Sequence, residues 1–350
     1  MKRKKTIKDI ARETGLSTAT VSKYLNGIRI QEENRAAIEA AVERLGYRPN
    51  RSAQMLRSGR TRTIGVLISD LGNYFWGPVI GTISHYFAER QYTVVACSFN
   101  FDKQQEEQVI QDIISQNFEG IILLPFDDRD VSYHVLQEVG IPVVLLDQLP
   151  AYIGEYPVDT VLSDNYGGSV RLAELLYENG HRDIYILDRS LRSYTVDLRV
   201  KAILDVYARH GIDLHRHIGT YPPIPFMETQ SVIDQGRERI RQVMNGPSPP
   251  TAVFFTNYLT AMGGLNALNS SGTRIPEDLS LVCFDYDPLF SAMQTSMTCV
   301  SQDLASMGTR AAELLMRRIS GDYETFPEAV IVDVQFHQGE SVRSLALKDP

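Results

Sequence analysis

The apolar positions of the first fifty residues repeat every three or four positions, which predicts three short helices. Gly15 interrupts the first repeat and is free to adopt the positive φ of a tight turn. Ser17 suits the N-cap of the second helix, Asn26-Gly27 would end that helix, and Gly46 follows the third. The apolar faces expected to be buried are Ile7, Ile10 and Ala11; Val21, Tyr24 and Leu25; and Ile38, Val42 and Leu45.

From Thr63 onward the pattern changes to short, continuous apolar runs that alternate with helical periods. Such alternation predicts parallel sheets with helices on both faces. A body of about 290 residues exceeds what one sheet usually organises, so we expect two doubly wound α/β lobes. The expected strands are 64–68, 93–97, 121–124, 143–146, 159–163, 184–187, 252–255 and 281–284, and the expected helices include 103–117, 166–179, 196–210 and 230–245.

Composition narrows the class of protein. The chain has 350 residues, of which 43% are hydrophobic and 22% charged, enough for a large buried core. Its longest apolar runs, 121–125 and 141–146, are far shorter than the roughly 18 residues of a membrane helix, and no apolar segment of a secretory signal follows the charged first residues. The three cysteines form no CxxC pair, so neither zinc nor a disulfide framework is expected. We expect a soluble cytoplasmic protein.

Charge is distributed very unevenly along the chain. Residues 1–63 contain 15 Lys and Arg against 6 Asp and Glu, a net charge of +9, and the remaining residues carry −17. A basic head on an acidic body indicates that the head meets a polyanion while the body is repelled by it.

The helical pattern of the head identifies that polyanion as DNA. Two short helices joined by a turn with a glycine form a helix-turn-helix, whose second helix enters the major groove. Lys23 suits guanine acceptors, Thr18 suits either a hydrogen bond or a thymine methyl, and Ala19 suits an apolar contact, whereas phosphate contacts fix the register. The expected contacts are Thr18, Ala19, Ser22 and Lys23 with bases, and Thr6, Ser17, Asn26 and Asn34 with phosphates.

The segment between head and body permits two interpretations. Asn50 suits the N-cap of a helix of about two turns, a length that is marginal alone in water. Leu56 stands among arginines, as expected for a wedge that enters the minor groove when the helix orders on DNA. The alternative is a plain interdomain linker. The first interpretation makes Asn50, Ala53, Gln54 and Leu56 DNA contacts.

Polar and aromatic residues follow the expected strands of the body. In doubly wound sheets, ligands bind beyond the carboxyl ends of the strands. Carboxylates and amides suit the hydroxyls of a polyol, and aromatic rings suit its faces, although an aspartate in this position often only caps a helix. The residues at these ends are Asp70, Asn73, Phe75, Trp76, Phe126, Asp127, Asp147, Asp188 to Ser193, Asn257 and Asp285.

Enzyme signatures are missing from the sequence. It contains neither a Walker A segment nor a GxGxxG after the first strand, so no nucleotide cofactor is expected, and it contains no GxSxG. His210, His215 and His217 cluster in an expected loop, and we expect no metal there. The remaining alternatives are a DNA-bound activator and a free sugar-binding protein, and the second would need an export signal.

The motifs of the head and linker resemble those of the LacI/GalR family of bacterial repressors. The resemblance rests on TIKDIARETGLSTATVSKYLN at 6–26, LGYRPN at 45–50, and Ala53 with Leu56. It implies a periplasmic-binding-protein-like type I body whose chain crosses between lobes three times, near Thr160, Pro288 and Gly321. It also implies a dimer whose paired hinge helices place Leu56 in the operator. Gln31 departs from the family pattern, where Ser or Thr caps the third helix.

The same resemblance extends to the expected ligand site. Asn73-Tyr-Phe-Trp76 is similar to the family's Asn-Pro-Phe-Phe, with Tyr74 in place of proline, and Arg199 matches an arginine that commonly binds effector. Asn257 and Asp285 match two further motifs, in which Tyr258 replaces an aspartate and Cys283 a glycine. The expected effector-binding residues are Asn73, Phe75, Trp76, Phe126, Asp147, Ser193, Arg199, Asn257, Asp285 and Gln302.

These observations predict a dimeric, effector-controlled regulator, a repressor by resemblance, that needs no cofactor. It would bind pseudo-palindromic operator DNA and a small effector, with a neutral sugar favoured over an anionic derivative. The expected domains are a helix-turn-helix head at 1–48, a hinge at 49–62, an N-terminal lobe at 63–160 and 290–321, and a C-terminal lobe at 161–289 and 322–340.

Overall fold

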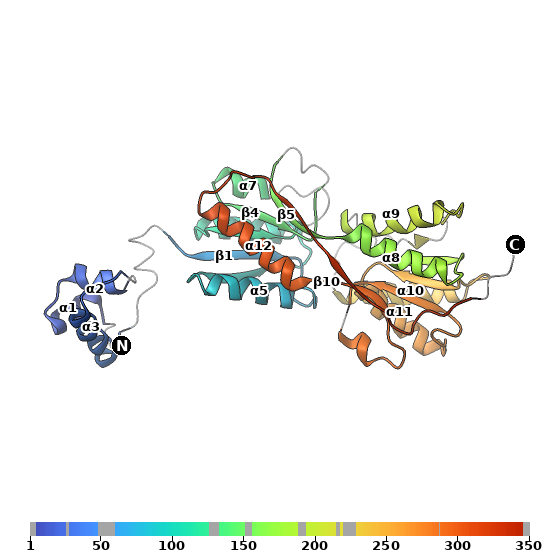
Figure 1. Ribbon diagram of the computed structural model, residues 1–350, viewed down its shortest axis with the longest axis horizontal. Coiled ribbons are helices and arrows are strands. Elements are labelled where there is room, and N and C mark those ends of the chain that lie inside the picture. The colour runs from blue at the N-terminus through green and yellow to red at the C-terminus, as the bar shows by residue number, and fades with distance from the viewer. Residues whose placement is uncertain are drawn as a thin grey trace. The chain divides into compact units, whose positions relative to one another are not determined.

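The computed structural model describes two compact units, residues 1–61 and 62–350, which we call the head and the body (Figure 1). The described residues are 5–25, 28–47, 60–125, 133–150, 156–187, 194–214, 218–219, 229–286 and 288–345.

The described residues of the head form the three predicted helices, α1 (Ile7–Thr14), α2 (Thr18–Leu25) and α3 (Glu32–Leu45). Gly15 ends α1 with a φ of 71°, and Ser17 Oγ accepts a hydrogen bond from Thr20 N–H at 3.1 Å at the start of α2. Gln31 makes no side-chain cap at the start of α3. The predicted helix stop at Asn26-Gly27 lies outside the described residues. The buried core of the head is Ile10, Ala11, Val21, Ile38, Ala41 and Tyr47.

The body contains two six-stranded sheets, one in each lobe (Figure 1). The sheet of the N-lobe is parallel throughout, in the order β11-β5-β4-β3-β1-β2, and the sheet of the C-lobe has the order β12-β10-β9-β8-β6-β7 with only β12 antiparallel. The N-lobe comprises β1 (Thr63–Ile68), α5 (Trp76–Ala88), β2 (Thr93–Ser98), α6 (Lys103–Ser115), β3 (Gly120–Leu123), α7 (Tyr133–Glu138), β4 (Val143–Leu146), β5 (Asp159–Ser163), α12 (Leu304–Ile319) and β11 (Ala329–Val332). The C-lobe comprises α8 (Asn165–Glu178), β6 (Ile184–Leu187), α9 (Tyr194–Ala208), β7 (Ile218–Gly219), α10 (Thr229–Met244), β8 (Ala252–Phe255), α11 (Tyr258–Ser271), β9 (Ser280–Phe284), a 3₁₀ turn (Pro288–Ala292), β10 (Thr298–Gln302) and β12 (Val334–His337).

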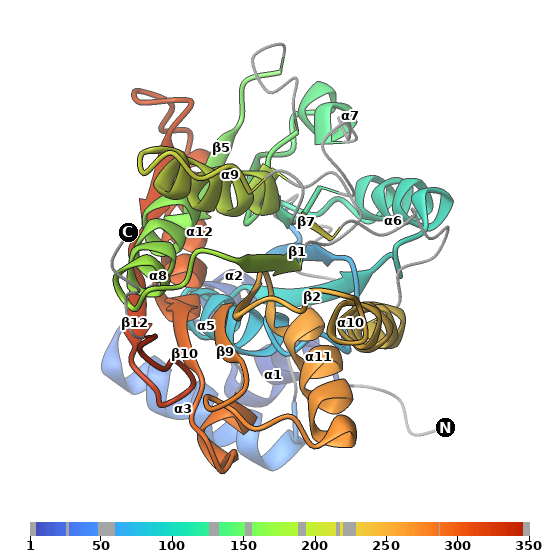
Figure 2. The same cartoon turned by 90° about the vertical axis from the view of Figure 1, so that its right-hand side faces the viewer.

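Helices cover both faces of each sheet, as the continuous apolar strands predicted. In the N-lobe, α5 and α12 pack on one face, and α6 and α7 on the other. In the C-lobe, α10 and α11 pack on one face, and α8 and α9 on the other (Figure 2). Each lobe is therefore a three-layer α/β sandwich with two buried cores.

Two of the three crossings between the lobes lie at other places than we predicted. The first crossing, between β5 and α8, lies a few residues after the predicted position near Thr160. The second and third lie between β10 and α12 and between β11 and β12, instead of near Pro288 and Gly321. The boundaries 290–321 and 322–340 therefore differ from the structure, because β10 pairs with β9 in the C-lobe and β11 pairs with β5 in the N-lobe. The sequence of β10 mixes polar with apolar residues, so the apolar pattern did not mark it as a strand.

Candidate ligand pocket and nucleic-acid interface

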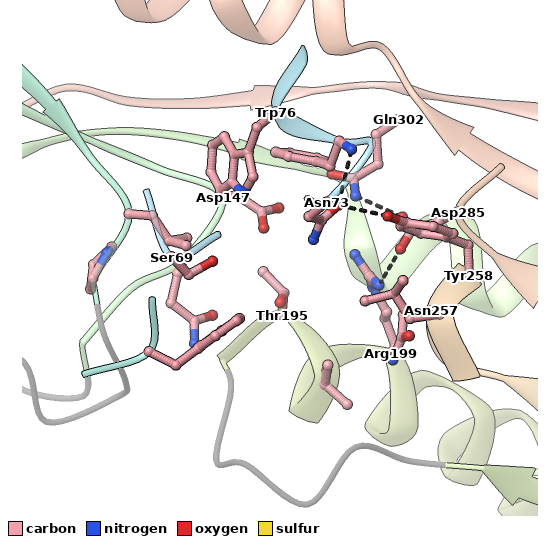
Figure 3. Close-up of a pocket in the computed structure, with 17 residues that line it drawn as sticks. Ser69, Asn73, Trp76, Asp147, Thr195, Arg199, Asn257, Tyr258, Asp285 and Gln302 are labelled. Atoms are coloured by element: carbon pink, nitrogen blue, oxygen red, sulfur yellow. Dashed lines mark hydrogen bonds and ion pairs between the residues drawn. The ribbon is translucent and has the colours of Figure 1, made fainter. Parts of the chain in front are cut away.

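A cavity lies between the lobes, where the strands of both sheets end at their carboxyl ends (Figure 3). It encloses about 110 Å³, which is below the roughly 300–1,000 Å³ of typical ligand pockets. The lining residues are Ser69, Asn73, Phe75, Trp76, Phe101, Leu124, Pro125, Asp147, Gln148, Thr195, Val196, Arg199, Asn257, Tyr258, Leu259, Asp285 and Gln302.

Most of the predicted effector-binding residues line this one cavity. Phe126 and Ser193 lie outside the described residues. The rule that ligands lie beyond strand ends also applies to Ser69 and Gln148, which the sequence interpretation missed because both look like ordinary strand-end residues. The predicted residues in the lining are Asn73, Phe75, Trp76, Asp147, Arg199, Asn257, Asp285 and Gln302.

Arg199, on α9, is the centre of the polar wall of the C-lobe. Its side chain is 4% exposed, and its Nε donates to Asn165 Oδ1 at 2.8 Å. Its Nη1 donates to the carbonyl oxygen of Thr256 at 2.7 Å and lies 3.3 Å from Asp285 Oδ2. The guanidinium also lies over the ring of Phe284, 3.8 Å from its centroid. A buried charge is tolerated only when it is paired and hydrogen-bonded, and these contacts meet that requirement.

Asp285 extends this network toward the N-lobe. Its φ of 81° turns the chain sharply at the end of β9, a conformation that aspartate adopts more readily than most residues. Gln302 Nε2 donates to Asp285 Oδ1 at 2.7 Å, and Ser163 Oγ donates to Gln302 Oε1 at 2.5 Å. Ser163 ends β5 in the N-lobe and Gln302 ends β10 in the C-lobe, and the chain crosses between the lobes directly after each of them. The hydrogen bond between Ser163 and Gln302 therefore links two of the crossing segments.

The N-lobe contributes aromatic rings to the lining, beside the polar residues Ser69, Asn73, Asp147 and Gln148. The rings of Phe75 and Trp76 lie 4.8 Å apart in a T-shaped arrangement. Trp76 is only 3% exposed, and its Nε1 has no hydrogen-bond partner, as is also true of Asn257 Nδ2 across the cavity. Unpaired buried N–H groups are costly, so these two groups suit the acceptor oxygens of a ligand.

Neither a reactive thiol nor a metal cluster adjoins the cavity within the part of the chain that the structure describes. Burial, with a smaller effect of Asp285, raises the pKa of Cys299 to about 12, so this thiol stays protonated at neutral pH. No group of three His, Cys, Asp or Glu side chains there could hold a metal ion. His210 stacks on Tyr177, with ring centroids 3.7 Å apart, and His215 and His217 lie outside the described residues.

In the head, α2 has the properties of a recognition helix. Val21 is fully buried against the other helices, and the opposite face carries Thr18, Ala19, Ser22 and Lys23, of which only Ser22 is partly buried. Among the predicted phosphate contacts, Thr6 and Ser17 are exposed and Asn34 is partly buried. The predicted DNA contacts outside the described residues are Asn26, Asn50, Ala53, Gln54 and Leu56.

Comparisons with known proteins agree with both parts of the chain. Residues 6–50 match the model of the lacI family of bacterial regulatory proteins, and residues 173–342 match the model of a periplasmic binding protein-like domain. A ribose operon repressor of Haemophilus influenzae is 27% identical over 327 residues, which cover 93% of this chain and 95% of the relative.

Solved structures show the same fold. A Lac repressor dimer bound to operator and the anti-inducer ONPF has a TM-score of 0.82 at 22% identity, over 97% of this chain and all of that chain. The transcriptional regulator CelR in complex with cellobiose has a TM-score of 0.71 at 25% identity, with the same coverage.

A helix-turn-helix head and a two-lobed body with a cavity at its strand ends define a DNA-binding transcriptional regulator that responds to a small molecule. The chain combines a helix-turn-helix domain of the lacI family of bacterial regulatory proteins with a periplasmic binding protein-like domain. No helix among the described residues is long and apolar enough to span a membrane.

Proposed function

We propose that this regulator is a repressor whose binding to operator DNA is controlled by a neutral sugar or sugar derivative in the cavity between its lobes. One observation carries the proposal: the cavity combines an aromatic wall with a hydrogen-bonding wall on the same chain as a recognition helix. Carbohydrates present apolar ring faces and a rim of hydroxyls, so they match both walls.

The charges of the cavity favour a neutral ligand. Of the lining residues that the structure describes, only Arg199 is a cation, and its guanidinium already donates to Asn165, Thr256 and Asp285. A phosphate or carboxylate on the ligand would therefore lie beside Asp147 and Asp285 without a free cation to pair with. Arg189 and Arg192 lie outside the described residues, so an anionic sugar derivative is the second candidate, and the experiment below distinguishes the two.

The names of related proteins support the same ligand class. The relative from Haemophilus influenzae is a ribose operon repressor, and CelR was solved with cellobiose. We infer a homodimer on a pseudo-palindromic operator, since a single helix-turn-helix reads only one half-site. Thr18, Ala19, Ser22 and Lys23 would read the bases, and Leu56 would enter the minor groove between half-sites.

The proposal is tested in two steps on the full chain. An operator is first selected from a pool of random-sequence DNA duplexes, and we expect its affinity to fall about 10³-fold between 50 and 200 mM salt, because phosphate contacts dominate. D-Ribose, cellobiose and their phosphorylated forms are then titrated while emission from Trp76 is recorded. Trp76 is the only tryptophan of the chain and lines the cavity, so its emission reports on the site directly.

We expect a neutral sugar to change the emission of Trp76 and, at the same concentration, to change operator affinity measured by fluorescence anisotropy. A response to the phosphorylated sugars alone would replace the neutral ligand with an anionic one. The effector proposal would be wrong if no sugar changed both signals, and the DNA proposal would be wrong if selection enriched no sequence.

A further inference from the structure

Tyr258, which lines the cavity, connects the two lobes. Its ring lies in the apolar core of the C-lobe at the start of α11 and is 8% exposed. Its hydroxyl reaches the N-lobe, where it lies 2.8 Å from Asn73 Oδ1 (Figure 3) and 3.0 Å from the backbone nitrogen of Tyr74. One side chain of the C-lobe thus makes two hydrogen bonds to the segment that follows β1.

The directions of these hydrogen bonds are fixed by a backbone group. The N–H of Phe75 lies 3.0 Å from Asn73 Oδ1, and a backbone N–H can only donate, so the atom that faces it must be the amide oxygen. The N–H of Tyr74 likewise donates to the Tyr258 hydroxyl, which must use its own proton toward Asn73 Oδ1. The oxygen of Asn73 therefore accepts two hydrogen bonds, and its NH₂ group is left for a ligand.

We propose that Tyr258 is a positioning residue of the effector site, which holds the lobes together and turns the NH₂ group of Asn73 toward the effector. The proposal rests on the function proposed above and deepens it. The two lobes then provide three N–H donors to the effector, namely Asn73 Nδ2, Asn257 Nδ2 and Trp76 Nε1. The donors of Asn257 and Trp76 have no partner in the structure. The effector meets this set with acceptor oxygens, such as the ring and hydroxyl oxygens of a sugar.

The bridge is tested first without any effector. Tyr258→Phe keeps the ring in the core and removes only the hydroxyl, so the fold should be retained. We expect the lobes to open more often and acrylamide to quench Trp76 at least twofold more strongly than in the wild type. Tyr286→Phe removes a hydroxyl from another tyrosine of the C-lobe, outside the cavity lining, and should leave quenching unchanged. Equal quenching in Tyr258→Phe and the wild type would overturn the bridge.

A second pair of variants separates positioning from bridging. Asn73→Asp keeps an oxygen for Tyr258 and Phe75 but replaces the NH₂ donor, so quenching should stay as in the wild type. Its affinity for whichever of D-ribose and cellobiose binds the wild type should fall at least 10-fold. Tyr258→Phe should lower that affinity about 5- to 30-fold, because both hydrogen bonds of the bridge are lost.

These outcomes distinguish the bridge from the proposed function. Wild-type affinity in Asn73→Asp would overturn the positioning role even if quenching behaved as expected. If neither sugar binds the wild type, the proposed effector class fails, and the quenching of Tyr258→Phe still decides whether the bridge exists.

Discussion

The two lobes have the same architecture but contribute different chemistry to the cavity between them. The C-lobe contributes the network of Arg199, Asp285 and Gln302, in which each charged group has defined partners. The N-lobe contributes the rings of Phe75 and Trp76, which lie in a T-shaped pair with the indole N–H unpaired. The comparison indicates that the C-lobe holds a ligand in a fixed orientation, whereas the N-lobe covers its apolar face.

The lobes also differ in how closely their helices approach. In the C-lobe, a Cβ atom on Gly263 of α11 would lie 1.9 Å from the carbonyl oxygen of Ile233 on α10. In the N-lobe, a Cβ atom on Gly308 of α12 would lie 3.0 Å from the carbonyl oxygen of Val79 on α5. The backbones of α10 and α11 in the C-lobe are therefore in direct contact at Gly263. The backbones of α5 and α12 in the N-lobe are slightly farther apart at Gly308.

The largest expected effect tests this difference in packing. Gly263→Ala forces a methyl group into the backbone of α10, so it should lower the free energy of unfolding by about 3 kcal/mol or more. Gly308→Ala should cost about 1 kcal/mol or less, because a shift of a few tenths of an ångström relieves the contact. Urea titrations followed by circular dichroism measure both changes. Equal losses in the two variants would contradict the difference between the lobes.

The second prediction concerns the polar wall. Arg199→Ala should weaken binding of the effector sugar about 10- to 150-fold, since a hydrogen bond to a charged group contributes about 1.5–3 kcal/mol, while operator affinity without effector stays within twofold of the wild type. Lys201→Ala, an exposed position on the same helix, is the matched control and should bind sugar normally. Emission of Trp76 and anisotropy of labelled operator report the two affinities. Normal sugar binding in Arg199→Ala would mean that the C-lobe does not orient the ligand.

The smallest expected effect is the loss of one ion pair in each lobe, which contributes to stability at neutral pH and loses that contribution in acid. In the N-lobe, hydrogen bonds from Arg317 and Thr325 lower the pKa of Glu328 to about 2, and in the C-lobe Arg274 lowers the pKa of Asp278 to about 2. A carboxylate whose pKa is lowered in the folded state stabilises the fold above its unfolded pKa, about 4.5 for Glu328, and loses that contribution as the pH falls toward 2.

Substituting each carboxylate removes its part of this pH dependence. Glu328→Gln should lower the free energy of unfolding by about 1 kcal/mol at pH 7, after screening by solvent, and the difference should shrink between pH 4.5 and pH 3. Asp278→Asn should have a smaller effect, because its ion pair with Arg274 is more exposed. Urea midpoints at pH 7 and pH 3 provide the measurement. A difference that grew as the pH fell would contradict the role of Glu328.

The alternation of apolar runs and helical periods was sufficient to predict the layers of the fold. The strands 143–146, 159–163, 184–187 and 252–255 coincide with β4, β5, β6 and β8, because fully buried parallel strands are apolar throughout. β10 was missed, since its sequence TCVSQ interrupts the apolar run with polar residues. The second crossing follows the end of β10, so without this strand it was predicted too early in the chain.

The candidate site could be predicted only in part, for a similar reason. The strand-end rule and the resemblance found Asn73, Trp76, Asp147 and Asp285, which follow recognisable strands. Pairings between residues distant in sequence, such as Ser163 with Gln302, leave no local pattern. Tyr258 was noticed only as a departure from a motif, and its contact with Asn73 depends on how the lobes approach each other.

The crossings between the lobes also determine when the body can fold during synthesis. β10, α12, β11 and β12 all lie after residue 297, yet α12 and β11 complete the N-lobe that begins at Thr63. A ribosome must therefore translate almost the whole chain before either sheet is complete, and contacts between such distant segments form slowly. The head, whose core involves only residues from 10 to 47, is complete long before then. A message truncated before β10 would release a folded head attached to a body that exposes apolar strands, a product prone to aggregation and degradation.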